Sequence, residues 1–240
     1  MMDLLAQELG MDPLELRLRN ALVEGDDNCA GLRLTTSTGM VGCLERLREH
    51  PLWQERQAWK AQAPPQTRRG LGLAAVFNAA GYGGKVRDAA IAKVELNAEG
   101  KIVVHNAVTD MGQGNGSAFV QMAGHILSQD AAQMELRQPD TRTAYPSGSA
   151  SAGRTTYTFG NALIKACEEL RARLINRAGL LLFLDDDRDL RLVPGKVIHP
   201  PTGRQVEFAQ LAAFMPQEDR GCISQFVAPV CEQPPDTAKG

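Results

Sequence analysis

Two short glycine-rich stretches carry the residue types in this sequence that are best suited to hold a ligand. The first, TDMGQGNGS at residues 109–117, surrounds Gln113 with Gly112 and Gly114. Glycine lets the backbone approach a ligand closely, and a helix that begins just after such a loop presents unpaired N–H groups to an anion. The Gln113 amide adds a donor and an acceptor without adding charge. The same pattern is also typical of a flexible strand-to-helix turn, so both interpretations stay open.

This first stretch differs from the common phosphate-binding loops. A Walker loop requires a lysine after its last glycine, and a dinucleotide-binding fingerprint requires the spacing G-x-G-x-x-G. The sequence GQGNGS satisfies neither pattern. Nucleotide binding through this loop is therefore disfavoured.

The second stretch, SGSASAGRTT at residues 147–156, has the same character. Its small residues are crowded, and it leads directly into a predicted helix over residues 155–178. Two such loops, each at the start of a helix, could converge on one anionic ligand. A plain linker with Thr155 as the N-cap of the helix explains the same residues. Neither loop is specific when it is taken alone.

The elements that must position these loops fall into two predicted regions. Residues 1–67 form a helical N-terminal segment and a linker, and residues 68–240 form an α+β region. In the first region, Asp12 and Pro13 predict the start of a new helix within residues 2–22. Residues 43–50 and 51–60 read as two short helices, the second beginning at Pro51.

The second region changes to the period of a β-sheet. Residues 71–81 are apolar and compatible with a strand, and residues 89–108 predict a hairpin with its turn at Glu99-Gly100. A helix over 114–129, a short strand at 134–138 and a loop at 140–153 follow. The predicted helix over 155–178 has one apolar stripe, made of Ala162, Leu163, Ala166, Cys167, Leu170 and Leu174. Short strands at 189–208, a helix at 207–214 and a strand at 222–230 complete a fold of mixed sheets with packed helices.

Composition excludes several classes of protein. The chain has 240 residues, 43% of them apolar, and a net charge of −2. It shows no basic stripe with interleaved aromatic residues, so nucleic acid is not an expected partner. No signal peptide and no apolar run of membrane-spanning length occurs, so we expect no membrane contact and a cytoplasmic location. The five cysteines read as free thiols, because none has the spacing of a zinc ligand.

The order of the motifs, rather than any single one, resembles a known family. DMGQG at 110–114, DT at 140–141, the small-residue loop and RTTYTFGNAL at 154–163 are similar in order to the molybdopterin-binding large subunit of the xanthine dehydrogenase and aldehyde oxidase family. MDLLAQELGMDPLELRLRN and RRGLGLAAVFNAAGYGG match in order as well. The resemblance covers essentially the whole chain and is densest over residues 68–175. It implies that the fold is part of a molybdopterin-binding domain.

The resemblance also implies roles for particular residues. The residues that it assigns to cofactor binding are Met111, Gly112 and Gln113 in the first loop and Ala152, Gly153, Arg154 and Thr155 in the second. Gln113 would hydrogen-bond the cofactor near the apical oxo ligand. Arg154 would either pair with a phosphate or be a surface residue at a helix start. Tyr82 would stack on an aromatic substrate, whereas Asp110 and Asp140 are expected to be cap or turn residues.

The function that the resemblance implies belongs to a larger subunit. The cofactor is molybdopterin, either as such or as its cytosine dinucleotide, and its dithiolene rather than a protein side chain holds the metal. The parent protein would hydroxylate an aldehyde or N-heterocycle with water as the oxygen source. Its expected partners are the remainder of the large subunit, iron–sulfur and FAD subunits, and a small-molecule substrate. The rival hypothesis is a standalone ligand-binding or assembly module without catalysis.

No catalytic residue is assigned in this sequence. The family's general base lies in a Gly-x-Gly-Glu segment, and no such segment occurs here, so Glu207 and Glu232 are not given that role. The resemblance implies a central portion of the subunit, with the missing segments on either side. We expect the chain alone to be inactive and to lack the cofactor.

Overall fold

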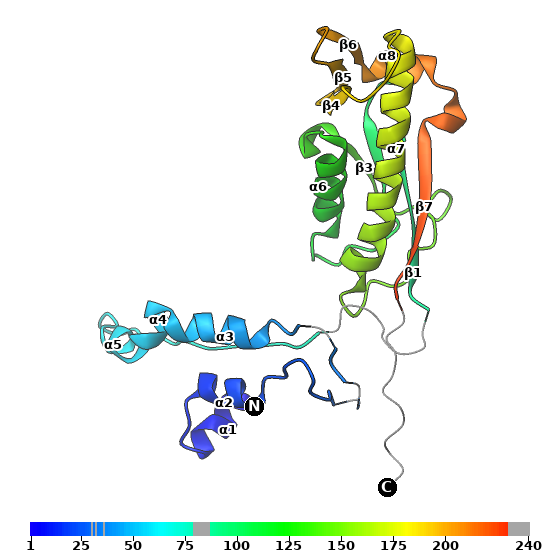
Figure 1. The fold of residues 1–240 in the computed structure, drawn as a ribbon. Coiled ribbons are helices and arrows are strands. Elements are labelled where there is room, and N and C mark those ends of the chain that lie inside the picture. Colours follow the sequence, from blue (N-terminus) through cyan, green and yellow to red (C-terminus); the bar gives the residue numbers. More distant parts are fainter. Residues whose placement is uncertain (30, 32, 36, 79–86, 230–240) are drawn as a thin grey trace. The chain divides into compact units, whose positions relative to one another are not determined.

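The computed structural model describes the chain except for residues 30, 32, 36, 79–86 and 230–240 (Figure 1). The described residues belong to two compact units, Met1–Phe77 and Asn78–Cys231. The boundary expected between residues 67 and 68 falls in the irregular segment that follows the last helix of the first unit. The two units are described separately below.

Short helices make up the regular structure of the first unit. They are α1 (Met2–Glu8), α2 (Pro13–Asn20), α3 (Met40–Glu49), α4 (Pro51–Gln54) and α5 (Arg56–Ala61). The Asp12 carboxylate accepts the N–H of Leu14 at 2.8 Å, and Pro13 follows it, which confirms the predicted start of α2. The helix expected over residues 51–60 is interrupted at Glu55, where the backbone leaves the helical region (φ −92°, ψ 8°).

The first unit buries few side chains. Its described core consists of Ala6, Leu14, Leu16 and Leu44. The strand considered for residues 71–81 does not form over residues 71–78, and residues 79–81 lie outside the described part. In the described structure no strand pairs with this segment. Instead, the Leu73 carbonyl accepts a hydrogen bond of 2.9 Å from the Arg17 guanidinium.

The second unit is built on a mixed four-stranded sheet with the order β3-β2-β1-β7. Its strands are β1 (Ala89–Leu96), β2 (Ile102–His105), β3 (Glu135–Arg137) and β7 (Gly221–Val227). β1 pairs in antiparallel fashion with β2 and with β7, whereas β2 and β3 are parallel. The predicted hairpin, the short strand near residue 135 and the final strand are therefore confirmed.

The alternation in β1 separates an apolar face from a polar one. Ala90, Ala92, Val94 and Leu96 are buried, and the residues between them are half-buried. Helices α6 (Asn115–Leu127) and α7 (Gly160–Leu181) lie side by side and pack on the apolar face (Figure 1). Every residue of the apolar stripe predicted for the helix over 155–178 is fully buried, which confirms that helix and its orientation.

A smaller antiparallel sheet contains β4 (Arg191–Val193), β5 (Lys196–His199) and β6 (Arg204–Glu207). Helix α8 (Phe208–Phe214) follows directly. Its start is fixed by Glu207 and Gln210, whose side chains cap each other's backbone N–H groups. The fold is thus α+β with mixed sheets and packed helices, as the sequence indicates.

The polar face of the large sheet carries a charge cluster where β1, β2 and β3 meet. The Glu95 carboxylate contacts His105 Nε2 at 2.9 Å, Lys93 Nζ at 2.6 Å and Arg137 Nη1 at 3.6 Å. The hydrogen bond from His105, followed by that from Lys93, lowers the pKa of Glu95 to about 2. Because these partners lie on β1, β2 and β3, the interactions of the ionised carboxylate stabilise the packing of the three strands against one another.

Candidate functional site

The parallel pairing of β2 with β3 places the two glycine-rich loops at one edge of the sheet. The first loop follows β2, and the second belongs to the segment that follows β3. Val104 faces Leu136 in this pairing, and the Asn106 N–H continues it by donating to the Arg137 carbonyl at 3.0 Å. Since the carboxyl ends of parallel strands meet at the same edge, loops that follow them can form a common ligand site.

Direct contacts connect the two loops close to the points where they begin. The Ser147 hydroxyl donates to the Ala107 carbonyl at 2.7 Å. At the beginnings of the helices, the rings of Phe119 and Phe159 have their centroids 4.6 Å apart. The structure therefore brings together the two stretches that the sequence singled out, although they are far apart along the chain.

The first loop is exposed and requires glycine. Gly112 and Gly114 have φ values of 102° and 77°, in the left-handed region that other residues avoid. Open space surrounds both glycines, because a Cβ atom added at either one would meet no atom within 4 Å. Met111 beside them is 72% exposed. A ligand can therefore approach the backbone of this loop closely.

The Gln113 amide is held within its own loop. Its oxygen accepts the Met111 N–H at 2.6 Å, and its nitrogen donates to the Thr109 carbonyl at 3.1 Å. Both bonds are exposed, so rotation of the side chain exchanges them for bonds to a ligand or to water without leaving a buried group unpaired. The amide is thus ordered at the mouth of the loop and remains accessible.

Backbone N–H groups just before α6, which the sequence left open as an anion site, are already engaged by a side chain of the same loop. The Asp110 carboxylate already accepts the N–H of Gly112 at 2.8 Å and that of Gly114 at 3.3 Å. These bonds, together with weaker ones from Gly116 and Asn115, lower the pKa of Asp110. A second negative charge here would be repelled. Asp110 is a turn residue, as predicted, and not a base.

The sequence analysis missed two buried asparagines at the first loop: Asn106 precedes the loop, and Asn115 lies within it at the start of α6. Asn106 and Asn115 are 2% and 4% exposed. The Asn106 oxygen accepts the Val108 N–H at 2.9 Å, and the Asn115 nitrogen donates to the Thr109 carbonyl at 3.1 Å. Asn106 Nδ2 and Asn115 Oδ1 have no partner among the described residues. Unpaired buried polar atoms are costly, so they fit a place that receives a further polar group.

In the second loop, the structure contradicts both interpretations of the Arg154 side chain. The side chain is buried at 1% exposure, so it is not a surface residue at a helix start. It does not face outward toward a phosphate either, because its Nε donates to Asp88 at 2.6 Å and its Nη1 donates to the Ser147 carbonyl at 2.7 Å. The backbone N–H of Arg154 donates to the Ser151 carbonyl at 3.1 Å.

The backbone at the end of the second loop has a left-handed conformation and leads into a π-helical turn. Ala152 has a φ of 50° and Gly153 a φ of 63°. The following helix begins with the π-helical segment η2 (Thr155–Phe159), which continues into α7. Thr155 is not the N-cap: Arg154 occupies that position, and no side-chain cap bond is present. Such π turns occur frequently at functional sites.

Two further residues from the sequence analysis, Tyr82 and Asp140, remain to be located. Tyr82 lies outside the described residues. Asp140 forms a turn by accepting the Arg142 N–H at 2.9 Å and pairs with the Arg142 guanidinium at 2.7 Å, which lowers the pKa of Asp140. In the part of the chain that the structure describes, no group of three or more His, Cys, Asp and Glu side chains is arranged to hold a metal ion. None of the helices described is long and apolar enough to cross a bilayer.

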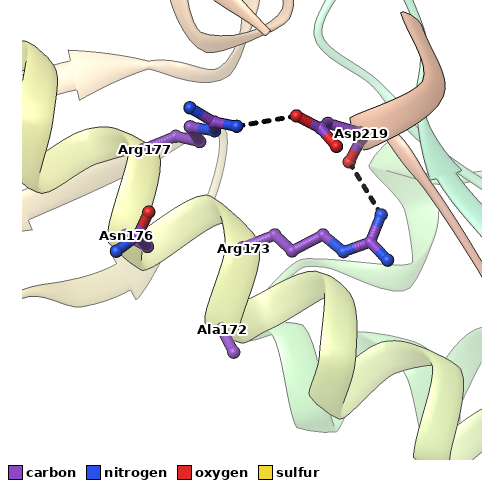
Figure 2. A pocket seen from close by; sticks show the side chains of 5 residues that line it. All are labelled: Ala172, Arg173, Asn176, Arg177 and Asp219. Atoms are coloured by element: carbon purple, nitrogen blue, oxygen red, sulfur yellow. Dashed lines mark hydrogen bonds and ion pairs between the residues drawn. The ribbon is translucent and has the colours of Figure 1, made fainter. Parts of the chain in front are cut away.

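A separate hollow of about 430 Å³ lies on α7, lined by Ala172, Arg173, Asn176, Arg177 and Asp219. Figure 2 shows that Asp219 lies between the two arginines: its carboxylate accepts from Arg177 at 2.7 Å, and its carbonyl accepts from Arg173 at 3.4 Å. Arg173 lies about 20 Å along the helix axis from Gly160 at a rise of 1.5 Å per residue. The charges in this hollow are already paired, and it is distant from the two loops.

The geometry of the loops suits binding rather than acid–base chemistry. The groups that the first loop offers to a ligand are the open backbone surface at Gly112 and Gly114, the Gln113 amide and the Met111 side chain. The Asp110 carboxylate is bonded to the backbone, and its lowered pKa makes it a poor base. The arrangement can therefore orient a polar, largely uncharged group at the edge of the sheet.

Comparison with known proteins agrees with this geometry. Residues 46–236 match the family model described as a molybdopterin cofactor-binding domain. The xanthine dehydrogenase molybdenum-binding subunit of Escherichia coli O157:H7 is 30% identical over 199 residues, which are 82% of this chain and 26% of that protein. The aldehyde oxidoreductase of Megalodesulfovibrio gigas is 34% identical over 174 residues, which are 71% of this chain and 19% of that protein.

Solved structures show the same fold. The crystal structure of quinoline 2-oxidoreductase from Pseudomonas putida 86 aligns with a TM-score of 0.62 at 20% identity, covering 97% of this chain and 32% of that one. The aldehyde oxidoreductase from Desulfovibrio gigas aligns with a TM-score of 0.59 at 28% identity, covering 95% of this chain and 22% of that one. The chain therefore spans about a fifth to a third of the length of such proteins.

Proposed function

This chain belongs to the molybdopterin cofactor-binding domain family, and we propose that its two loops together form one wall of the cofactor site in a molybdenum hydroxylase. The observation that carries this proposal is the position of both loops at one edge of the sheet, after the parallel strands β2 and β3. The bond between Ser147 and Ala107 at 2.7 Å fixes that arrangement. Xanthine dehydrogenase and aldehyde oxidoreductase subunits are relatives of the chain.

The residues of the first loop fit the cofactor through neutral groups. Gly112 leaves its backbone open to close approach, and Met111 and Gln113 are exposed beside it. In this proposal the Gln113 amide would exchange its bond to the Thr109 carbonyl for a hydrogen bond to the cofactor. An uncharged amide orients a ligand of the metal without adding charge to it. The unpaired atoms of Asn106 and Asn115 support the presence of a polar group close to this loop.

The second loop is proposed to hold the pterin and its phosphate. Ala152, Gly153 and Thr155 would supply backbone N–H groups and a hydroxyl, with Arg154 contributing through the loop conformation. This division of labour is consistent with the charge of the first loop, since Asp110 makes its surroundings unfavourable for a phosphate. The proposed cofactor is molybdopterin, either as such or as its cytosine dinucleotide.

The cofactor, when bound, would supply oxidative hydroxylation with water as the oxygen source. The residues of this chain would orient the cofactor and exclude bulk water from one side of it. The proposed substrate of the whole protein is an aldehyde or N-heterocycle, with Tyr82 as a stacking residue. We propose as partners the remainder of the large subunit together with iron–sulfur and FAD subunits, which would carry the electrons away.

Replacement of Gln113 by alanine in the complete, assembled subunit tests this proposal. We expect turnover to fall about 10-fold to 100-fold, the range seen when a group that orients a metal ligand is lost. Molybdenum and pterin content, and the thermal unfolding midpoint, should be measured on the same samples. Gln133→Ala serves as the matched control, because Gln133 is an exposed glutamine in the short helix η1 (Ala131–Gln133), away from both loops.

The rival hypothesis, a binding or assembly module without catalysis, makes the opposite prediction. Unchanged turnover and unchanged cofactor content in the Gln113→Ala protein would contradict the proposed role of the first loop. Loss of cofactor or activity with an unchanged unfolding midpoint would contradict the rival.

A further inference from the structure

Resting on the function proposed above, we infer that Arg154 is a positioning residue that fixes the shape of the second loop from beneath. It is among the largest fully buried side chains of the protein, at 1% exposure. Its counter-ion, Asp88, is 5% exposed and lies immediately before β1. A charged pair this deeply buried requires hydrogen bonds to almost every donor and acceptor that it contains.

The guanidinium meets that requirement by binding the backbone of the loop. Nη1 donates to the carbonyls of Ser147 at 2.7 Å and Ser149 at 2.8 Å, so it holds the loop on both sides of Gly148. Nη2 donates to the carbonyl of Ala89, the first residue of β1, at 3.0 Å. The planar fork of donors in arginine suits such a set of acceptors in fixed directions, which a lysine cannot reproduce.

Gly148 shows how closely the loop is wrapped around this side chain. A Cβ atom at Gly148 would lie 2.7 Å from Arg154 Nη1 and 2.8 Å from Nη2. The residue also has a φ of 71°, which disfavours any other amino acid. The second loop is therefore folded on the guanidinium itself, and both residues are needed for its shape.

Asp88 links this clamp to the elements around it. One carboxylate oxygen accepts from Arg154 at 2.6 Å, and the other accepts from the Thr158 hydroxyl in η2 at 3.2 Å. The Asp88 carbonyl accepts the N–H of Ala228, just after β7, at 2.8 Å. Through Asp88, the position of the loop is therefore fixed relative to β1, to β7 and to the start of the helix that follows it.

The clamp has a consequence for the outer end of the loop. Ala152 and Gly153 are both left-handed, a conformation that costs free energy at a non-glycine residue. Ser149 is held on one side of this turn and Arg154 on the other. With both ends fixed, the left-handed turn stays in place and its backbone keeps the direction in which it would meet the cofactor.

The test is Arg154→Lys in the complete subunit, followed by hydrogen exchange of the loop 147–153 and by cofactor content. Lysine keeps the positive charge but lacks the planar set of guanidinium donors. It should therefore preserve the fold without restoring the hydrogen bonds that hold the loop. We expect exchange in the loop to become about 10-fold faster, the signature of a loosened local structure, with exchange in α7 unchanged. Molybdenum and pterin content should fall several-fold.

Arg142→Lys is the matched control. Arg142 belongs to the same connection between β3 and α7, but its side chain is 85% exposed. Among the described residues, its ion pair is with the neighbouring Asp140. This variant should leave exchange and cofactor content as they are. If Arg154→Lys behaves in the same way, or if α7 exchanges faster to the same extent as the loop, the positioning role is overturned.

The two proposals can fail separately. Exchange of the loop needs no cofactor, so faster exchange in Arg154→Lys supports the clamp even where Gln113→Ala proves to be inert. In contrast, an effect of Gln113→Ala together with an unchanged loop in Arg154→Lys keeps the cofactor site and removes the clamp.

Discussion

The two loops at the edge of the large sheet are held by different means. The first is stabilised by residues within it: Asp110 bonds to Gly112 and Gly114, and the Gln113 amide bonds to Met111 and Thr109. The second is stabilised by the buried side chain of Arg154, whose partner Asp88 lies outside the loop, 66 residues away in the sequence. These bonds of the first loop are exposed, whereas the bonds that Arg154 makes are buried or partly buried.

This difference indicates a division of roles. A loop held by exposed local bonds can exchange them for bonds to a ligand at little cost, which suits the group that responds to the cofactor. A loop held by a buried ionic clamp resists deformation, which suits a rigid support. We therefore expect substitutions at the clamp to affect stability more than substitutions in the first loop.

The largest expected effect is that of Asp88→Ala. It leaves the Arg154 guanidinium buried without its counter-ion, and breaking a buried pair in this way typically costs about 3–5 kcal/mol. The free energy of unfolding of the second unit is best followed by hydrogen exchange in α7, because both tryptophans, Trp53 and Trp59, lie in the first unit. A loss below about 1 kcal/mol would show that the clamp is not a main support.

The Glu95 cluster supports the strands that carry both loops, and we expect a smaller, pH-dependent effect there. The pKa of Glu95 is about 2 in the folded protein and 4.5 as its ordinary value, so its contribution to stability is present above pH 4.5 and is lost as the pH falls toward 2. Glu95→Gln should cost roughly 2 kcal/mol at neutral pH.

The check on Glu95 is the pH profile of unfolding rather than a single value. The difference between the original protein and Glu95→Gln should shrink as the pH is lowered from 4.5 to 2. A difference that stays constant over this interval would mean that the carboxylate acts through packing and not through its charge. Glu99→Gln, in the exposed hairpin turn, is the control.

The smallest expected effect is the difference in stability lost when Gly112 or Gly148 is replaced by alanine, and it distinguishes the two loops most directly. Alanine at Gly112 meets open space and suffers only from its positive φ, at about 1 kcal/mol. Alanine at Gly148 suffers the same strain and also contacts the Arg154 guanidinium, so about 2 kcal/mol is expected. Equal losses in the two variants, measured by the same exchange experiment, would contradict the wrapping of the second loop around Arg154.

Much of the fold could be predicted from the sequence because its signals are local. The period-two pattern of residues 91–97 predicts β1, and the apolar stripe along residues 162–174 predicts the buried face of α7. Asp12 followed by Pro13 predicts the start of α2. The strand considered at residues 71–81 did not form over 71–78, because apolar composition alone does not supply a partner strand.

The candidate site shows where such reasoning ends. The sequence by itself determined the two loops, their order and their small residues, since the freedom of glycine and the start of a helix are local properties. Only the tertiary structure decided that β2 and β3 pair in parallel, which places the loops together, and that Arg154 lies inward against Asp88. Strand pairing and burial depend on residues far apart in the chain, and no local pattern specifies which of them will meet.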